Sequence, residues 1–158
     1  MVKLVVLALV VGFVESYLHQ IKWGTWLQDF VARVSMAIVT PIMPGLTRDG
    51  NEIRGAGPML MITLQCTALF ATGLFCAAVV AFPCTWRSRG IGLVVGVLGV
   101  GLVNIVRIVG LIMIARWAPK MLYFAHLVLM QGFLVSCVAP LWLAWAVWIS
   151  RRERLTSD

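Results

Sequence analysis

The chain has 158 residues, of which 61% are hydrophobic and 12% are charged, with a formal net charge of +7. Soluble domains carry about 25% charged residues, so this composition excludes an ordinary soluble domain and predicts one integral membrane domain over residues 1–158. The positive charge does not predict nucleic-acid binding, because the basic residues stand mostly at the ends of apolar runs, as membrane topology favours.

The N-terminal part predicts one membrane span and a long extracytoplasmic segment. The first apolar run, about 2–18, resembles the core of a signal peptide, but no small-residue cleavage site follows, so we expect an uncleaved span. Segment 19–58 begins with apolar residues at helical spacing and two tryptophans, which predict an amphipathic helix in the membrane interface. The expected apolar stripe comprises Trp23, Leu27, Phe30, Val31, Val34 and Ile38.

Three further apolar runs predict spans over about 59–82, 91–115 and 123–149. The second span begins near Gln65 instead if the stretch before it is extended. We expect the glycines of the third span to serve close helix packing, and residues 83–89 to form a loop. The predicted fold class is therefore all-α: a polytopic membrane protein with about four transmembrane helices and one interfacial helix.

The distribution of basic residues predicts the orientation of these spans. Lys3, residues 87–89 and the tail 151–154 alternate to one side of the membrane, and basic residues are denser in these short segments than in the opposite ones. Short loops rich in lysine and arginine stay in the cytoplasm. We therefore expect both termini in the cytoplasm and segment 19–58 outside it.

Asn104 and Arg107 lie three residues apart inside the predicted third span, which places them on one face of a helix. A charge at membrane depth costs about 2.5–3.5 kcal/mol on insertion scales, so such residues usually face a protein interior or a wet cavity. We therefore expect Arg107 to have a function. The alternative is an arginine that snorkels to the nearer headgroups.

The predicted topology brings three reactive side chains from separate spans to one depth. Cys66 lies in the outer part of the second span, Arg107 in the outer part of the third, and His126 near the start of the fourth. An imidazole can take the proton of a thiol, a nearby cation favours the thiolate, and a guanidinium can stabilise an oxyanion. This combination predicts thiol chemistry with Cys66, Arg107 and His126 as catalytic residues.

Three polar residues near these groups are candidates for supporting roles, and Cys66 and His126 also have simpler structural explanations. Gln65, Thr67 and Asn104 are expected to support the catalytic groups. Taken alone, Cys66 is more often a packing residue and His126 an interfacial one. The cysteines contain no CxxC pair, and we expect neither a metal nor a cofactor.

These residues resemble the exosortase/archaeosortase family of membrane-embedded cysteine transpeptidases, from about Leu64 to Val138. The matching segments are Cys66 at the opening of a span, Phe82-Pro83-Cys84-Thr85-Trp86-Arg87, Asn104-Ile-Val-Arg107-Ile108 and Ala125-His126-Leu127. The short chain and the F-P-x-x-W-R loop are most similar to the exosortase H branch. One departure is Thr67-Ala68, since the family cysteine is usually followed by a small polar residue and glycine.

The resemblance implies an enzyme of the bacterial inner membrane with its active site toward the extracytoplasmic face. Its partners would be exported proteins with a C-terminal sorting tail, made of a short motif, a transmembrane helix and a basic cluster, besides the membrane lipids. By motif match, Cys66 would be the nucleophile, His126 the acid/base, and Arg107 the stabiliser of the oxyanion or the thiolate.

Two other functions are consistent with the sequence. The first is a non-enzymatic membrane scaffold or assembly subunit, with the glycine-rich third span and Trp142, Trp145 and Trp148 as contact faces. The second is a small transporter or channel that uses Arg107 to line a path, although four spans with one buried charge argue against it.

Overall fold

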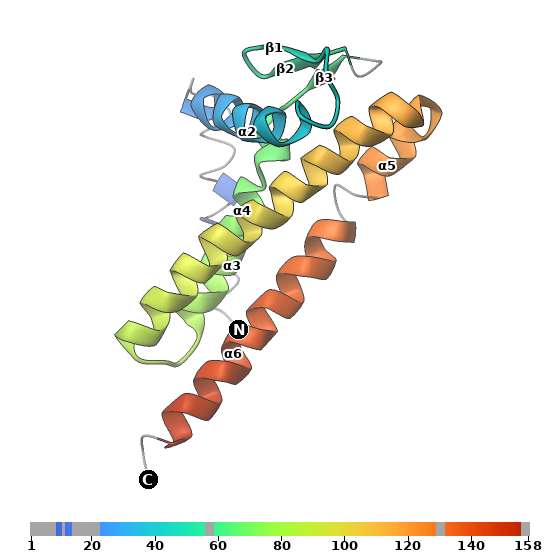
Figure 1. Cartoon of the computed structure of the whole chain (residues 1–158). Coiled ribbons are helices and arrows are strands. Elements are labelled where there is room, and N and C mark those ends of the chain that lie inside the picture. Colours follow the sequence, from blue (N-terminus) through green and yellow to red (C-terminus); the bar gives the residue numbers. More distant parts are fainter. Residues whose placement is uncertain (1–8, 11, 14–22, 56–58, 129–131, 156–158) are drawn as a thin grey trace.

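The computed structural model describes residues 9–10, 12–13, 23–55, 59–128 and 132–155 (Figure 1). Most of the predicted first span therefore lies outside the described residues. The described part is mainly helical, as expected. Within it, two helices are long and apolar enough to cross a membrane, α4 (Trp86–Trp117) and α6 (Leu134–Leu155). The number of spans in the whole chain stays a prediction.

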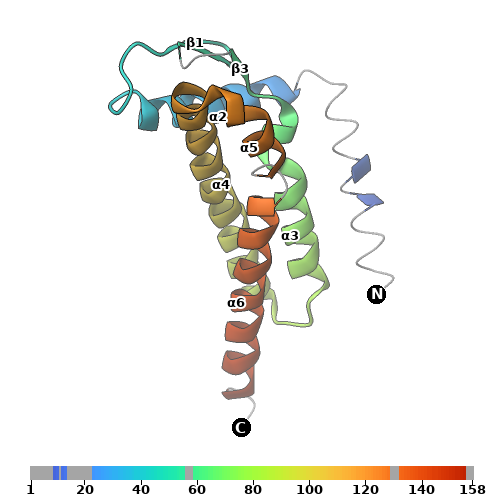
Figure 2. The same cartoon turned by 90° about the vertical axis from the view of Figure 1, so that its right-hand side faces the viewer.

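α4 is the central helix of the bundle. It packs against both α3 (Leu69–Ala81) and α6, which also contact each other, so that the three helices form a bundle (Figures 1 and 2). Large apolar side chains of α4 also face outward, with Leu98 68% and Leu102 67% exposed. Large apolar side chains exposed in such numbers mark a surface that contacts something other than water.

Glycines allow this close packing in the first half of α4. A Cβ atom added at Gly92 would lie 2.5 Å from the ring of Trp145, and one at Gly96 would lie 2.3 Å from the ring of Phe75. Both distances are far below van der Waals contact, so any larger residue would displace α6 or α3. The packing role expected for the glycines thus holds here, whereas a Cβ at Gly101 would meet nothing within 4 Å.

The second and third predicted spans have different boundaries in the structure. The stretch before α3 is extended and then forms a short 3-10 helix, η1 (Leu64–Thr67), so the alternative of a later start is the one found. α4 begins at Trp86, inside the loop expected over 83–89, because the Thr85 hydroxyl accepts a hydrogen bond from Ser88 N and caps the helix.

The described residues of the fourth predicted span belong mainly to two helices. The first is a short helix, α5 (Leu122–Val128), which follows the 3-10 turn η2 (Pro119–Met121) and packs against α4. The helix α6 covers most of the rest of this span, from Leu134. Residues 129–131 lie outside the described part, so the fourth span over about 123–149 stays a prediction.

The predicted amphipathic helix is present as α2 (Trp23–Val39), which lies across one end of the bundle (Figure 1). Its buried face comprises Val31, Ala32, Ser35 and Val39 and packs on η1 and α4. Val31 of the predicted apolar stripe belongs to this buried face, whereas Phe30 and Ile38 are 49% and 45% exposed, and the contact of the stripe with lipid stays a prediction. Phe30 stacks on Trp26 at the surface, with ring centroids 5.9 Å apart.

A small antiparallel sheet, which the sequence analysis did not predict, covers α2. Its order is β1 (Thr47–Asp49), β2 (Glu52–Arg54) and β3 (Leu60–Met61). Gly50 has φ +57 in the two-residue loop that joins β1 to β2, a conformation that tight hairpin turns require. Ile53 in the middle strand is fully buried and joins the core beneath.

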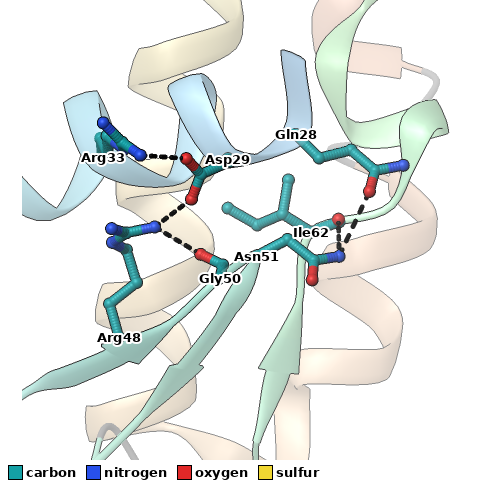
Figure 3. Close-up of polar contacts among 7 residues, drawn as sticks. All are labelled: Gln28, Asp29, Arg33, Arg48, Gly50, Asn51 and Ile62. Atoms are coloured by element: carbon teal, nitrogen blue, oxygen red, sulfur yellow. Dashed lines mark hydrogen bonds and ion pairs between the residues drawn. The ribbon is translucent and has the colours of Figure 1, made fainter. Parts of the chain in front are cut away.

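Polar contacts fasten the sheet to α2 (Figure 3). Asp29 on α2 accepts hydrogen bonds from Arg48 on β1 and forms an ion pair with Arg33, 2.6 Å away. The Asn51 amide donates to the carbonyl of Ile62 over 2.8 Å and, at 3.3 Å, to Gln28 on α2. The sheet and α2 thus form one cap over the end of the bundle, which we call the polar cap (α2 and β1–β3).

Candidate functional site

Cys66 lies on η1, the turn between the polar cap and α3. The Cys66 amide donates to the carbonyl of Thr63 over 2.9 Å, and the Thr67 hydroxyl donates to the carbonyl of Leu64 over 2.6 Å, which closes the turn. Ala68 follows in the left-handed conformation, with φ 54, and ends the 3-10 helix before α3 begins. The chain therefore changes direction immediately after the candidate nucleophile.

The left-handed residue explains the departure noted at Thr67-Ala68. A residue with a Cβ is strained at positive φ, whereas glycine is not. The glycine usual at this place in the resembling family therefore suits the backbone conformation of the turn, rather than only making room for a substrate. Ala68 is 4% exposed and holds this conformation inside a packed core.

The thiol of Cys66 is buried, with the residue only 6% exposed. It packs in a cluster with side chains of α2, β2 and α4. Its sulfur lies 3.5 Å from the hydroxyl oxygen of Thr63, a hydrogen bond in which either atom can donate. The sequence analysis did not single out Thr63. The spacing of three residues within one turn is the feature that would have indicated it.

Asn104 and Arg107 form a buried polar pair beside this turn. The Asn104 amide donates to the carbonyl of Cys66 over 2.8 Å, and Arg107 NH1 donates to the Asn104 side-chain oxygen over 3.1 Å. The two residues are 1% and 2% exposed. A snorkelling arginine would reach outward, so that alternative does not describe Arg107.

The guanidinium of Arg107 lies near the thiol of Cys66. A cation at this place can stabilise an oxyanion that develops beside the sulfur. Asn104 connects Cys66 and Arg107 through hydrogen bonds. Its side-chain nitrogen donates to the Cys66 carbonyl, and its side-chain oxygen accepts from Arg107. The structure thus brings together three of the six expected site residues.

The other three expected site residues have different positions. His126 lies on α5, its side chain is exposed, and in the described residues no hydrogen bond joins it to Cys66 or Arg107. Thr67 is buried and serves the turn, as described above. Gln65 is exposed and lines the cavity described next. Within the described residues, no three His, Cys, Asp or Glu side chains are placed to hold a metal ion.

A cavity of about 980 Å³ opens between α3 and α6. At one end it reaches Gln65 and Ala68, the residues on either side of the Cys66–Thr67 pair, and the side chain of Arg107. Elsewhere its walls are apolar. Pockets for small molecules occupy about 300–1,000 Å³, so this cavity is large enough for a bound molecule or a segment of polypeptide.

Comparisons with known proteins agree with the membrane character of these helices. No curated protein and no solved structure matches the chain significantly. A protein-family model, described as transmembrane exosortase (Exosortase_EpsH), matches residues 1–145, which is most of the chain.

Proposed function

Because this chain belongs to the transmembrane exosortase family, we propose that it is a membrane-embedded cysteine protease or transpeptidase. The family expected from its motifs is thereby confirmed. Its substrates would be exported proteins with a C-terminal tail of motif, apolar helix and basic cluster. The observation that carries the proposal is the buried connection between Cys66, Asn104 and Arg107. A bundle that only had to pack would gain nothing from burying an arginine beside a thiol.

The reaction would begin at Cys66. The thiolate attacks the carbonyl carbon of the scissile peptide, a carbon–sulfur bond forms, and the carbonyl oxygen becomes an oxyanion. A buried guanidinium stabilises such an anion more than it would in water, because the site excludes solvent. Collapse of the intermediate breaks the carbon–nitrogen bond and leaves a thioester on Cys66. Water or an acceptor amine then attacks the thioester and restores the thiol.

His126 is proposed as the group that moves protons. It would take the proton of the thiol and give it to the departing amine, so the charge on the enzyme balances over the cycle. Its place in the family motif supports this role. The packing of α5 on α4, the helix of Arg107, also supports it. The histidine stands on α5, which directly follows η2 in the chain.

We further propose a location in the bacterial inner membrane, with both termini in the cytoplasm and the Cys66 end toward the extracytoplasmic face. The positions of the basic residues support this orientation. Arg87 and Arg89 begin α4, and Arg151 and Arg152 lie near the end of α6, both at the end of the bundle away from the polar cap (Figure 1). Basic residues concentrated at one end favour the cytoplasmic side.

Substitution of the cysteine tests the proposal. We expect Cys66→Ala to abolish maturation of a tailed substrate in cells while the protein remains inserted and folded. Cys137→Ala, on α6, is the matched control and should leave maturation unchanged. A thioester-linked substrate fragment trapped on Cys66 and identified by mass spectrometry would support the mechanism. Normal maturation in the Cys66→Ala strain would contradict the proposal.

The scaffold alternative gains no support from the tryptophans on which it depended. Trp145 is 4% exposed and packs against Gly92, and Phe82 contacts both Trp145 and Trp142 edge to face. Of the three, only Trp148 is exposed, at 47%, and Arg152 lies over its ring. These aromatic side chains therefore hold the bundle together more than they offer a contact face.

A further inference from the structure

The cavity between α3 and α6 has two chemically different parts. At the end near the polar cap, Arg107, Gln65 and Ala68 supply its few polar groups and its contact with the Cys66 turn. Beyond them, the side chains of both helices that face the cavity are apolar, and among the residues that the structure describes Arg107 is the only charged one that lines it. An apolar trough with one polar end suits a molecule of the same two-part character.

The dimensions of the cavity match a helix better than an extended chain. On α3 it runs from Ala68 to Ala78, about 15 Å at 1.5 Å per residue. This is about half of a hydrocarbon core of roughly 30 Å. A helix about 10 Å wide occupies about 120 Å³ per residue, so the cavity volume corresponds to about eight residues, or two turns.

The small side chains that line the cavity point to the same kind of occupant. Ala71 and Ala78 on α3 and Ala139 on α6 contribute little bulk to its walls. Helices associate in lipid where small residues let their backbones approach closely, since lipid supplies no hydrophobic driving force. Pro140, next to Ala139, cannot donate a backbone hydrogen bond within α6, which adds a local irregularity at this wall.

We propose that this cavity is the groove in which the apolar helix of the substrate's sorting tail lies during cleavage, an inference that rests on the proposed function. A helix placed there would begin at the Cys66 turn and run toward the end of the bundle that carries Arg87, Arg89, Arg151 and Arg152. The order of the tail fits this direction. Its motif would lie at the turn, and its basic cluster would lie at the same membrane face as the enzyme's own basic residues.

The groove approaches the thiol from the α3 side. Cys66 does not line the cavity, whereas Gln65 and Ala68 do, and the sulfur packs behind them toward α2. The segment that precedes the substrate helix must therefore pass Gln65 and Ala68 to meet the thiol. Seating the apolar helix in the groove would limit the scissile bond to this short stretch of the turn.

Photo-crosslinking on the full-length enzyme in membranes tests the groove. The background is Cys66→Ala, and the probe is a reporter that carries the C-terminal tail of an exported protein from the same genome, with or without its apolar helix. A photoreactive residue at Leu74 or Leu143, both lining the groove, should form adducts with the reporter helix. The same residue at Leu98, on the outward face of α4, should give less than about a tenth of that yield.

A pair of substitutions provides the second measurement. Ala139 and Ala144 are both exposed on α6, but only Ala139 lines the groove. Ala139→Phe should slow maturation of the reporter about tenfold or more, the loss expected when a packed site is overfilled. Ala144→Phe should leave maturation within about twofold of the wild-type rate.

The outcomes separate this inference from the proposed function. If Cys66→Ala still matures the reporter, the enzyme itself is overturned. If Cys66→Ala blocks maturation, but Ala139→Phe is fully active and Leu74 and Leu143 form no adduct with the reporter helix, only the groove is overturned. Adducts from these positions that consist only of lipid, a second copy of the chain or residues 1–22 of the same chain would also overturn it.

Discussion

The two halves of α4 serve opposite purposes. In the first half, Gly92 and Gly96 bring the rings of Trp145 and Phe75 against the helix backbone, and neither position has room for a larger residue. In the second half, Asn104 and Arg107 are buried as a polar pair, and a large cavity reaches the same arginine. Glycine, the smallest residue, allows close packing in the first half. The second half buries an arginine, whose desolvation costs free energy.

This contrast indicates how a small membrane protein can carry a reactive site. A buried arginine and an open cavity both cost stability, because the charge is desolvated and the cavity walls lose contacts. Close packing of α3, α4 and α6 at the other end offsets that cost. We therefore expect substitutions in the second half to change mainly activity and substitutions in the first half to change mainly stability.

The largest effect is expected at the polar half. Arg107→Gln should lower the rate of substrate maturation by about 100-fold or more, because the guanidinium that faces the thiol is lost. The melting temperature in detergent should not fall, since removal of a desolvated charge is often neutral or stabilising. Arg116→Gln, at the exposed end of the same helix, is the control and should change neither quantity. An Arg107→Gln enzyme that unfolds early would mean that the arginine is mainly structural.

The packed half should show the reverse. Gly96→Ala would place a methyl group 2.3 Å from the Phe75 ring, and we expect a loss of about 1–3 kcal/mol in unfolding free energy. The activity of the folded fraction should stay near that of the wild type. Gly101→Ala, where a methyl group meets nothing within 4 Å, should be neutral or stabilising. Equal melting temperatures for the two variants would contradict the packing described for this half.

A smaller effect is expected at Ala68, in the turn that follows Cys66. Ala68→Gly should raise the unfolding free energy by about 1 kcal/mol, because glycine adopts the left-handed conformation without strain. Ala144→Gly, in an exposed turn of α6, should lower it by about the same amount. Differential scanning calorimetry would check the opposite signs. A destabilised Ala68→Gly variant would mean that the methyl group contributes more through packing than it costs in strain.

The smallest effect concerns the polar cap. Partial desolvation alone would raise the pKa of Asp29. Hydrogen bonds from Arg48 and Arg33 lower this pKa by a larger amount, so it lies below its ordinary value. A carboxyl group whose pKa is lower in the folded state stabilises the fold above its unfolded pKa, and this contribution disappears as the pH falls through the folded pKa. Asp29→Asn should therefore lower the melting temperature slightly at pH 7, and this deficit should disappear in acid, once the pH is below the lowered pKa of Asp29 in the folded state.

Asp49→Asn is the control for this carboxyl group. The Asp49 side chain is 83% exposed and lies 4.0 Å from Arg54, so its removal should change stability little at either pH. A deficit in the Asp29→Asn protein that stays constant from pH 7 into acid would contradict the assignment of this pH dependence to Asp29.

The predictability of the fold differed along the chain for physical reasons. Long apolar runs and the proline at position 83 located the membrane helices, because hydropathy and a missing backbone donor act locally. The start of α4 was missed because the Thr85 cap outweighed the expectation of a loop. The sheet was missed because three strands of two or three residues leave almost no period-two pattern.

For the site, the sequence indicated the residue types better than their arrangement. Arg107 and Asn104 stood out because polar groups are rare at membrane depth, and the structure brings both to Cys66. The positive φ of Ala68 could not be predicted, because it depends on the tertiary contacts around the turn. The place of His126 was inferred from the predicted start of the last span, and its side chain is exposed on α5, because the distance between two elements depends on tertiary packing that one apolar run does not encode.

The burial of Ile53 limits how the polar cap can change over evolution. Its neighbours in the strand, Glu52 and Arg54, face away from the core and carry opposite charges. Because side chains alternate, the gain or loss of one residue in this hairpin would turn a charged group inward, whereas a change of two would restore the pattern. Among related sequences, length differences in the strands of this hairpin should therefore occur in even numbers.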